Sequence, residues 1–369
     1  MIIGSLLRYG GTEKHFLQLL EGLKEDFEFS VYHLNPERGK AYELISQYSK
    51  VIDLNFKGTF LGLFYSIISA YKSLRKQGPD LIYSTTLIGL ILILPYSVIF
   101  KVPIISARRS LYSSSIFTWN KIIKKLIFLI NNISSKKIIG NSDAVGKLTL
   151  TEAFSKKKYL TINNGVDLKK FKKADERGID KFREEFGITS NDFIIGSVGN
   201  YRKVKNHGQI IEAAKIVSRA NNAIKFFIIG DGIERNNLER MISQYGLEES
   251  VILTGYRSDL TEALSIIDIF VMTSTSEGSP NALIEAFAMK KLVIATNVPS
   301  INEIIKHQKN GFLVELYDND ALANQILRIY EDYDNMKMIK EEAFNTVLKD
   351  YDIENNLVKF KNSFYEVIG

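Results

Sequence analysis

Residues 269–289 read IFVMTSTSEGSPNALIEAFAM. The apolar run at 269–272 and the polar loop after it are typical of a buried parallel strand that ends abruptly. Ser279 is a good N-cap and Pro280 suits the first helical position, so the pattern predicts a helix that begins there. A strand, a short loop and a helix in this order form the repeating unit of a parallel sheet wrapped by helices.

The same alternation of apolar runs and helical periodicity continues in both directions along the chain. We expect strands at residues 29–34, 51–54, 81–83, 103–106, 137–140, 159–162, 193–198, 225–229, 251–253, 269–272, 292–295 and 311–314. Two sets of about six strands predict an α/β fold with two Rossmann-like domains. We expect an N-terminal domain over residues 1–172 and a C-terminal domain over residues 173–351. A final helix over residues 352–369 is expected to pack back on the N-terminal domain.

The length and composition fit two globular domains. A chain of 369 residues is too long for one hydrophobic core, and 45% hydrophobic residues with only 6 Pro exclude a disordered or collagen-like chain. The absence of Cys excludes a disulfide scaffold, a thiolate metal site and a Cys nucleophile, and it fits a reducing compartment. The 4 His are scattered without ligand spacing, which argues against a zinc enzyme.

The charge is unevenly distributed along the chain. Residues 1–172 hold 25 Lys and Arg against 12 Asp and Glu, whereas residues 173–369 hold 23 against 30. A basic first half suits nucleic acid, anionic lipid or a phosphorylated substrate, and it is equally consistent with a solvated Lys-rich surface. No ladder of stacking aromatic residues accompanies the basic residues, so we expect no nucleic-acid partner.

Two apolar segments raise the question of membrane contact. Residues 81–100 carry no charge, but their Pro and polar residues favour a strand, a buried helix and a further strand over a membrane-spanning helix. Residues 119–138 combine helical spacing of Ile and Leu with three Lys beside Trp119. This pattern predicts an amphipathic helix, which would lie either on an anionic membrane surface or against its own sheet. No charged stretch precedes an apolar one at the N-terminus, so we expect no signal peptide.

Two carboxylates accompany the loop and helix at 269–289, namely Glu277 in the loop and Glu285 in the helix. The free N–H groups and the positive dipole end of a helix start suit a diphosphate. Each carboxylate can accept two hydrogen bonds from a vicinal diol, and a diphosphate flanked by two diols describes a nucleotide sugar. On spacing alone, two Glu beside a helix start are also consistent with ordinary surface charge.

The segment from Glu277 to Glu285 resembles the E-x7-E motif, in its E-G-x-P-N form, of the retaining glycosyltransferases of family 4. Further segments resemble motifs of that family and follow the family's order. These segments are GGTE at 10–13, NNGVD at 163–167 with Phe171, GNYRKVK at 199–205, GDG at 230–232, GY at 255–256 and NGF at 310–312. The likeness therefore covers nearly the whole chain.

The resemblance implies a GT-B fold, in which two Rossmann-like domains face a central cleft. It implies that the C-terminal domain binds the donor, that the N-terminal domain binds the acceptor, and that the anomeric configuration is retained without a metal or a cofactor. By position, Glu277 would hold sugar hydroxyls, Glu285 the ribose, and Arg202 and Lys205 the diphosphate.

Fixed cations are most effective on that diphosphate, where negative charge builds as the sugar leaves. Arg202 and Lys205 on the diphosphate, with Glu277 on the sugar, are therefore the catalytic residues that the resemblance implies. A solvated basic loop is the alternative interpretation of the two cations. The other expected donor contacts are Gly11, Gly278, Ser279, Pro280, Asn281, Ala282, Leu283 and Tyr256.

The chain departs from the family pattern at two positions that matter for the site. Many members have a His after the strand at 103–106, where this chain has Arg108 and Arg109. We expect one of these Arg residues to contact the donor or the acceptor. Asn200 stands where many members have Arg, and we expect Arg202 to compensate.

Two further features of the sequence have structural interpretations. The chain opens MIIGS, so a first strand ahead of the GGTE segment is either very short or begins upstream. The D-x-D pairs at 318–320 and 332–334 look like metal motifs of another glycosyltransferase fold. Both pairs fall near predicted helix ends, where Asp is a common cap, so we expect no metal there.

Together these features predict a metal-independent retaining glycosyltransferase that moves a hexosyl or N-acetylhexosaminyl group from a nucleoside-diphosphate sugar, most often UDP-linked in this family. The expected acceptor is a saccharide or lipid-linked saccharide of bacterial lipopolysaccharide or capsule assembly. The expected location is the cytoplasm, with peripheral binding to the inner face of the cytoplasmic membrane. Two alternatives stay open: a nucleotide-sugar epimerase of the same fold, and a catalytically silent binding or scaffold subunit.

Overall fold

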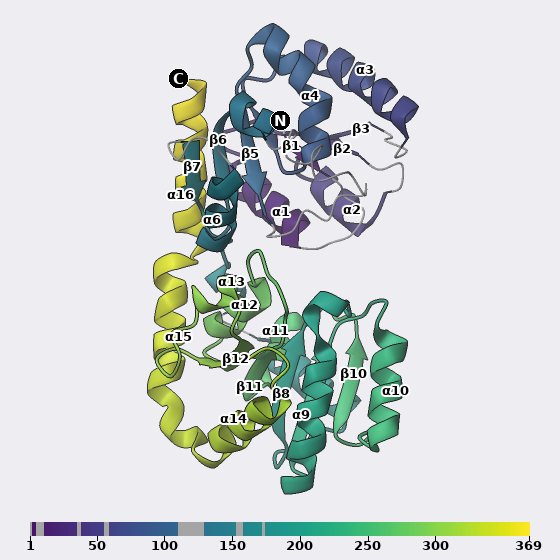
Figure 1. Cartoon of the computed structure of the whole chain (residues 1–369), viewed down its shortest axis with the longest axis vertical. Coiled ribbons are helices and arrows are strands. Elements are labelled where there is room, and N and C mark those ends of the chain that lie inside the picture. The colour runs from purple at the N-terminus through teal and green to yellow at the C-terminus, as the bar shows by residue number, and fades with distance from the viewer. Residues whose placement is uncertain are drawn as a thin grey trace. The chain divides into compact units, whose positions relative to one another are not determined.

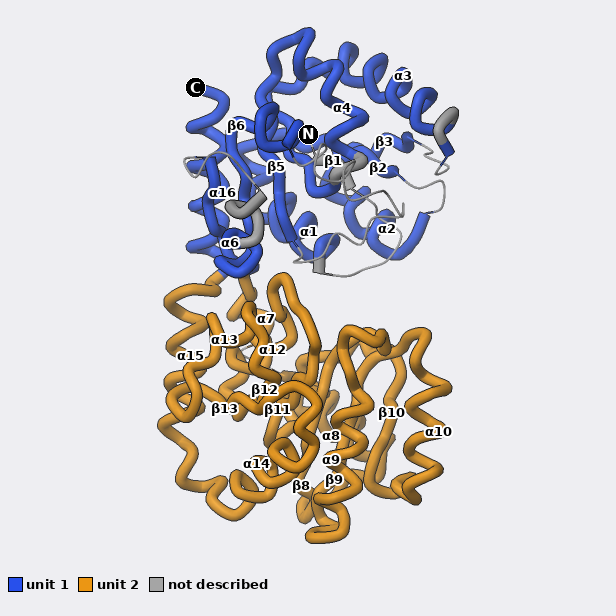
Figure 2. The backbone as a smooth tube through the Cα atoms, viewed as in Figure 1, with its two compact units in different colours: residues 1–164, 353–369 blue, residues 165–352 orange. Residues whose placement is uncertain are grey.

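The computed structural model describes residues 2–4, 11–34, 38–54, 59–109, 129–152, 158–171 and 174–369. The chain divides into two compact units, one formed by residues 1–164 and 353–369 and the other by residues 165–352 (Figure 2). Each unit holds one parallel β-sheet with helices packed on it (Figure 1). The predicted α/β fold with two Rossmann-like domains is therefore confirmed.

Within the described residues, the sheet of the first unit contains seven parallel strands in the order β3-β2-β1-β4-β5-β6-β7. They are β1 (Ile2–Gly4), β2 (Ser30–His33), β3 (Lys50–Asp53), β4 (Ile82–Ser84), β5 (Ile104–Arg108), β6 (Ser135–Gly140) and β7 (Tyr159–Thr161). Strand β1 has only three residues, yet Ile2 is paired with Val31 of β2 on one side and with Tyr83 of β4 on the other. The short first strand therefore lies inside the sheet.

Two groups of helices bury separate sets of apolar residues in the first unit. Helices α1 (Gly11–Leu23), α2 (Lys40–Ser46) and α16 (Ile353–Ile368) share one buried cluster, to which α16 contributes Phe360 and Phe364. Helices α3 (Phe60–Gln77) and α4 (Leu87–Phe100) share the other cluster, with Leu74 and Ile93 fully buried. Helix α6 (Asp143–Glu152) follows β6. The C-terminal helix thus belongs to the first unit.

The second unit, which is described without a gap from residue 174, contains a six-stranded parallel sheet in the order β10-β9-β8-β11-β12-β13. Its strands are β8 (Phe193–Val198), β9 (Ile224–Ile229), β10 (Val251–Gly255), β11 (Ile269–Met272), β12 (Leu292–Thr296) and β13 (Phe312–Val314). Its α-helices are α7 (Leu168–Phe171), α8 (Glu176–Glu185), α9 (His207–Ala220), α10 (Arg235–Tyr245), α11 (Leu260–Ser265), α12 (Asn281–Ala288), α13 (Pro299–Asn302), α14 (Asn319–Glu331) and α15 (Lys337–Asp350). The described residues of this unit also form the 3₁₀ turns η2 (Lys203–Lys205) and η3 (Tyr333–Met336).

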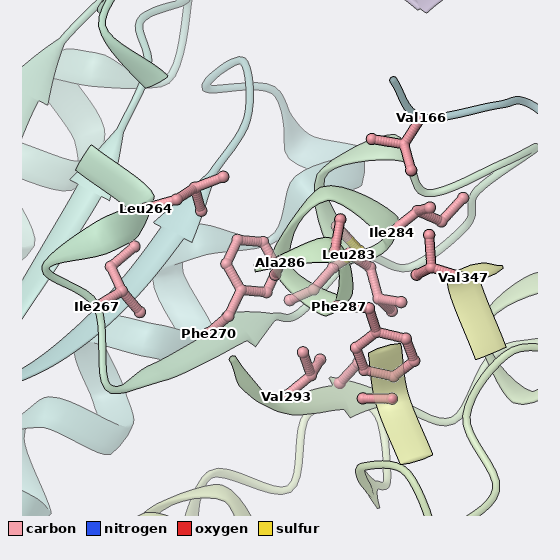
Figure 3. Packing of buried hydrophobic residues seen from close by; sticks show 14 of the residues in the cluster. Val166, Leu264, Ile267, Phe270, Leu283, Ile284, Ala286, Phe287, Val293 and Val347 are labelled. Carbon is pink, nitrogen blue, oxygen red and sulfur yellow. The ribbon is translucent and has the colours of Figure 1, made fainter. Parts of the chain in front are cut away.

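Helix α12 is held against the sheet by its apolar side chains. Leu283, Ala286 and Phe287 are completely buried, and they pack with Phe270 of β11 and Val293 of β12 (Figure 3). Burial of a Leu or Phe side chain contributes roughly 1.5–3 kcal/mol. The packing fixes the position of the helix start relative to the carboxyl end of β11.

The predictions for the two apolar segments of the first unit compare differently with the structure. Residues 81–100 form β4 and α4, as predicted, and no helix in the described part of the chain is long and apolar enough to span a bilayer. In the segment 119–138, residues 119–128 lie outside the described residues, and 129–134 are helical. The prediction of a helix as far as residue 138 is wrong, because β6 begins at Ser135 and pairs with β5 and β7.

Candidate functional site

The predicted loop and helix at 269–289 lie where the order of strands in the second sheet reverses. Strands β8 and β11 are neighbours, and the strands that follow each of them run outward in opposite directions. The loops that leave such a pair of strands at their carboxyl ends separate from each other, and ligands of open α/β sheets bind in the crevice they leave. The segments 199–206 and 273–280 are these two loops.

The start of α12 offers backbone donors to an anion. Helix α12 begins at Asn281 with Pro280 as its N-cap, so the prediction of Ser279 as the N-cap is wrong by one residue. The cause is local: the Asn281 N–H donates to the Ser279 carbonyl, while the Ser279 hydroxyl is buried and has no hydrogen-bond partner among the described residues. The N–H groups of Gly278 and Ala282 likewise make no backbone hydrogen bond to the described residues. Such unpaired donors at a helix start suit a phosphate.

Glu277 is paired with a lysine from the other loop. Its Oε1 atom lies 2.5 Å from the Lys205 Nζ and 2.6 Å from the Ser274 Oγ. The Glu277 side chain is 11% exposed and that of Lys205 is 23% exposed. The contact is therefore a charge-assisted hydrogen bond between two groups that are largely shielded from solvent. The structure therefore brings together two of the three residues that the sequence predicts as catalytic.

The two loops are also joined through two threonines. The Thr273 hydroxyl lies 2.9 Å from the carbonyl oxygen of Asn206 and 3.1 Å from that of Lys205. The Thr275 N–H donates to the Val204 carbonyl over 2.8 Å. These bonds hold the backbones of both loops in register, so the contact between Lys205 and Glu277 does not depend on two flexible side chains alone.

The loop after β8 is held in place by contacts with the GDG segment at 230–232. The Tyr201 N–H donates to the Asp231 carbonyl over 2.9 Å, and the Tyr201 hydroxyl donates to the Ile228 carbonyl over 2.6 Å. A Cβ atom on Gly230, whose φ is +145°, would lie 2.0 Å from the Gly199 carbonyl oxygen. A residue without a side chain is therefore needed where this backbone crosses.

His207 is a member of the site that sequence reasoning did not identify. It is the first residue of α9, is 4% exposed, and meets the Tyr201 ring edge-on at 5.4 Å between centroids. Burial, and to a smaller extent the charge of Lys205, lowers the pKa of His207 to about 3. A neutral His207 therefore adds no charge beside Lys205. Ser274 was missed as well, because a Ser three residues before a Glu has no distinctive sequence signal.

The other predicted residues of the second unit have different surroundings. Arg202 is exposed, and within the described residues its side chain makes no ion pair or hydrogen bond. Glu285 is only 5% exposed although it is a carboxylate, which is costly unless polar groups surround it. Tyr256 follows β10 at the carboxyl edge and is 60% exposed.

Gly11, Arg108 and Arg109 belong to the first unit. Gly11 is the first residue of α1, and its neighbour Gly10 lies outside the described residues. Arg108 is the last residue of β5, and Arg109 follows it. The structure thus distributes the predicted site residues over both units.

The half-buried Arg109 joins three buried polar side chains, and we call this group the Arg109 cluster: His15, Tyr83, Arg109 and Asn164. The Arg109 Nη2 atom donates to the Asn164 Oδ1 over 2.5 Å, and the His15 Nε2 lies 3.1 Å from the Tyr83 hydroxyl. Burial raises the pKa of Tyr83 to about 12, although Arg109 acts in the opposite direction. Burial, reinforced by the charge of Arg109, holds the pKa of His15 well below its usual range. The cluster therefore keeps His15 neutral beside the Arg109 cation.

The D-x-D pairs have structural roles. The Asp318 side chain accepts a hydrogen bond of 2.8 Å from the Ala321 N–H and caps α14, as predicted. Asp332 ends α14 and accepts from the Asn335 side chain. In the part of the chain that the structure describes, no three His, Asp or Glu side chains gather as a metal site would require.

Solved structures that align with nearly the whole chain identify the fold. The crystal structure of HepE from Anabaena in complex with UDP-glucose is 21% identical, with a TM-score of 0.86 over 99% of this chain and 98% of that chain. A glycosyltransferase from Rickettsia africae is 21% identical, with a TM-score of 0.86 over 100% of this chain and 97% of that chain. The chain has the GT-B fold of the glycosyltransferases.

Two family models match consecutive parts of the chain. The model described as Glycosyltransferase Family 4 matches residues 9–170, and the model described as Glycosyl transferases group 1 matches residues 178–346. The chain belongs to glycosyltransferase family 4, as the E-x7-E segment predicts.

Curated relatives match over a shorter stretch. The UDP-Gal:alpha-D-GlcNAc-diphosphoundecaprenol alpha-1,3-galactosyltransferase of Escherichia coli is 31% identical over 215 residues, which cover 57% of this chain and 55% of that protein. The N-acetyl-alpha-D-glucosaminyl L-malate synthase of Bacillus anthracis is 27% identical over 209 residues, which cover 56% and 54%. The chain spans about half the length of the curated relatives it matches.

Proposed function

We propose that the protein is a retaining glycosyltransferase that moves a hexosyl or N-acetylhexosaminyl group from a UDP-sugar to a saccharide or lipid-linked saccharide in bacterial surface polysaccharide biosynthesis. The observation that carries this proposal is the contact of Lys205 with Glu277, next to the Gly278 and Ala282 N–H groups, which make no backbone hydrogen bond to the described residues. A cation, a carboxylate and backbone donors within two adjoining loops match the phosphates and the hydroxyls of a nucleotide sugar.

In this proposal the diphosphate binds at the start of α12, and the protein supplies the compensating charge without a metal. The Gly278 and Ala282 N–H groups, the Ser279 hydroxyl and the exposed Arg202 would contact the phosphate oxygens. As the bond from the anomeric carbon to the phosphate breaks, negative charge grows on the leaving diphosphate. Fixed donors that are already oriented stabilise this charge at no cost of rearrangement.

Lys205 and Glu277 would exchange partners when the donor binds. Lys205 would turn from the Glu277 carboxylate toward the diphosphate, and Glu277 would accept hydrogen bonds from the sugar hydroxyls. Glu285 would accept from the ribose hydroxyls. Both carboxylates are suited to these roles because an ionised carboxylate accepts several hydrogen bonds and donates none.

The names of relatives support the proposed acceptor and the proposed location. The Escherichia coli relative acts on a sugar linked to diphosphoundecaprenol, and a Campylobacter jejuni relative, 27% identical over 238 residues, is named for an N,N'-diacetylbacillosaminyl-diphospho-undecaprenol substrate. A lipid-linked acceptor of this kind requires the enzyme to work at the cytoplasmic membrane face. Arg108 or Arg109 would contact the donor or acceptor from the first unit.

The proposal is tested by incubating the purified chain with radiolabelled UDP-glucose, UDP-galactose and UDP-GlcNAc in EDTA, together with undecaprenyl-diphosphate-linked monosaccharides. The expected result is a labelled lipid product with an α-linkage from at least one donor, and no product with Glu277→Gln. Conversion of the donor sugar without any acceptor would instead identify an epimerase. Donor binding without turnover on any acceptor of the panel would favour a silent binding subunit.

A further inference from the structure

Helix α3 exposes large apolar side chains along one face. Phe64, Tyr65 and Ile68 are 58%, 68% and 38% exposed, whereas Ala70 and Leu74 on the other side of the helix are completely buried. Phe64 and Tyr65 make a ring contact with each other at 6.5 Å. Adjoining exposed aromatic side chains on one face are typical of a protein or membrane interaction surface.

The same face becomes basic toward the end of the helix. Lys72, Arg75 and Lys76 are exposed and lie on the face of Phe64 and Ile68, because side chains three or four residues apart adjoin on a helix. The three cations and the apolar Ile67, Ile68 and Tyr71 line a hollow of about 510 Å³. A ligand in this hollow would therefore contact apolar side chains and positive charges at the same time.

The end of α4 extends this surface. The ring of Phe100 lies 6.1 Å from that of Tyr71 on α3, and Figure 1 shows the two helices side by side. Val98 and Ile99 are 68% and 61% exposed, and Lys101 follows them. We call the face of α3 from Phe64 to Lys76, together with the end of α4 from Val98 to Lys101, the α3–α4 surface.

The positive charge around this surface favours an anionic partner. Residues 59–103 contain four basic residues and a single acidic one, Asp80. Exposed aromatic side chains that enter the headgroup region, flanked by Lys and Arg, are typical of protein surfaces that lie on anionic membranes. In a symmetric dimer through the same face, the cations of one copy would meet those of the other, which is unfavourable.

We propose that the α3–α4 surface docks the protein onto an anionic lipid bilayer. This inference deepens the proposed function, on which it rests for its biological reason: a lipid-linked acceptor is reached only by an enzyme held at the membrane. The apolar side chains would insert into the headgroup region of the bilayer, and the cations would give the preference for anionic headgroups.

The test is flotation of the full chain with two kinds of vesicle, one of phosphatidylcholine alone and one of equal parts phosphatidylcholine and phosphatidylglycerol. We expect at least tenfold stronger partitioning to the anionic vesicles at low salt. The variant Lys72→Glu/Arg75→Glu/Lys76→Glu should lose this preference. The variant Phe64→Ser/Tyr65→Ser/Ile68→Ser should lose the binding that persists at high salt, where electrostatic attraction is screened.

Matched variants control for changes in overall charge and apolar area. Lys24→Glu/Lys337→Glu/Lys349→Glu changes the net charge equally at three exposed positions away from the α3–α4 surface. Ile233→Ser/Met338→Ser/Val358→Ser removes side chains that are 82%, 84% and 55% exposed. Both control variants should bind the anionic vesicles like the unaltered protein.

Several outcomes would overturn the inference. They are absence of binding, equal binding to both kinds of vesicle, or unchanged binding by the two α3–α4 variants. A dimer in size-exclusion chromatography that the Phe64→Ser/Tyr65→Ser/Ile68→Ser variant dissociates would assign the surface to a second copy of the chain instead. UDP titration of the same samples separates the two proposals: UDP binding without vesicle binding contradicts only the docking surface, and the reverse contradicts only the proposed function.

Discussion

The Lys205 Nζ atom lies 2.5 Å from the Glu277 Oε1 atom, although 72 residues separate them along the chain. One residue ends the turn after β8 and the other precedes α12, so the pair connects the two loops that leave adjacent strands of the second sheet. The cation expected on the donor diphosphate and the carboxylate expected on the donor sugar are thus partners. In the proposed function the donor separates them, so replacing each residue in turn measures its contribution.

Replacing Glu277 should affect turnover and nucleotide binding in opposite ways. Glu277→Gln keeps the shape of the side chain but frees Lys205 and removes a negative charge near the diphosphate. We expect turnover to fall by roughly 10²-fold or more, as for loss of a group that acts in the transition state. Calorimetry should show UDP bound as tightly as before or more tightly. A parallel loss of UDP affinity would contradict the proposed role, and Glu239→Gln, an exposed carboxylate paired with Arg235, serves as the control.

The two predicted diphosphate cations should differ in their effect on stability. Lys205→Met leaves the largely buried Glu277 without its cation, which should destabilise the second unit by roughly 1–3 kcal/mol. Arg202→Met removes an exposed side chain with no ion pair among the described residues, so its effect should stay within about 0.5 kcal/mol. Both variants should weaken UDP binding roughly tenfold or more. Urea unfolding and calorimetry measure the two effects, and equal destabilisation by both would argue against the pair as a structural link.

The sequence predicted the strands well because parallel strands that are covered on both faces consist of continuous apolar runs. Residues 193–198 and 269–272 were predicted with the bounds that the structure gives to β8 and β11. The sequence also indicated the loop and helix around Glu277, since loop and cap residues follow the strand directly. It did not predict the partner of Glu277, because that contact depends on which strands adjoin in the sheet.

Gly230 should resist substitution for reasons of both space and backbone conformation. Its φ of +145° is rare for residues with a side chain, and a Cβ there would meet the Gly199 carbonyl oxygen at 2.0 Å. Gly230→Ala should therefore lower the stability of the second unit by roughly 2 kcal/mol or more and weaken UDP binding, because the loop with Arg202 and Lys205 must shift.

Gly208→Ala is the matched control for this substitution. Gly208 lies in helix α9, and a Cβ there would make an ordinary contact of 3.5 Å with Met241. We expect this variant to be as stable as the unaltered chain or more stable by about 0.5–1 kcal/mol. Equal effects of the two substitutions would contradict the close crossing of the two backbone segments.

The buried His207 should make the second unit sensitive to acid. Its pKa of about 3 in the folded protein lies below the ordinary value of 6.5, so the unfolded chain binds more protons between these pH values. Stability should therefore fall as the pH decreases from 6.5 toward 3, by at most about 1.4 kcal/mol per pH unit from this group. His207→Gln should reduce this slope. An NMR titration that places the His207 midpoint near pH 6.5 would contradict the prediction.

Two predictions from local sequence are wrong, one because of pairing between distant strands and one because of a local hydrogen bond. The helical spacing of residues 119–138 does not extend to their end, because pairing of Ser135–Gly140 with two strands overrides the periodicity. Ser is a residue type that N-caps prefer, yet Pro280 is the N-cap of α12. The buried Ser279 hydroxyl has no hydrogen-bond partner among the described residues. The Arg109 cluster could not be predicted, because its members come from segments up to 149 residues apart in the sequence.

The loops around Lys205, Glu277 and Glu285 should bind the nucleoside diphosphate of a sugar donor, and calorimetric titration with UDP in EDTA measures this binding directly. We expect UDP to bind without a metal, GDP and ADP to bind more weakly, and Glu285→Gln and Glu285→Ala each to weaken UDP binding at least tenfold while circular dichroism stays unchanged. Absence of UDP binding by the unaltered chain, or equal affinity in well-folded Glu285 variants, would contradict it.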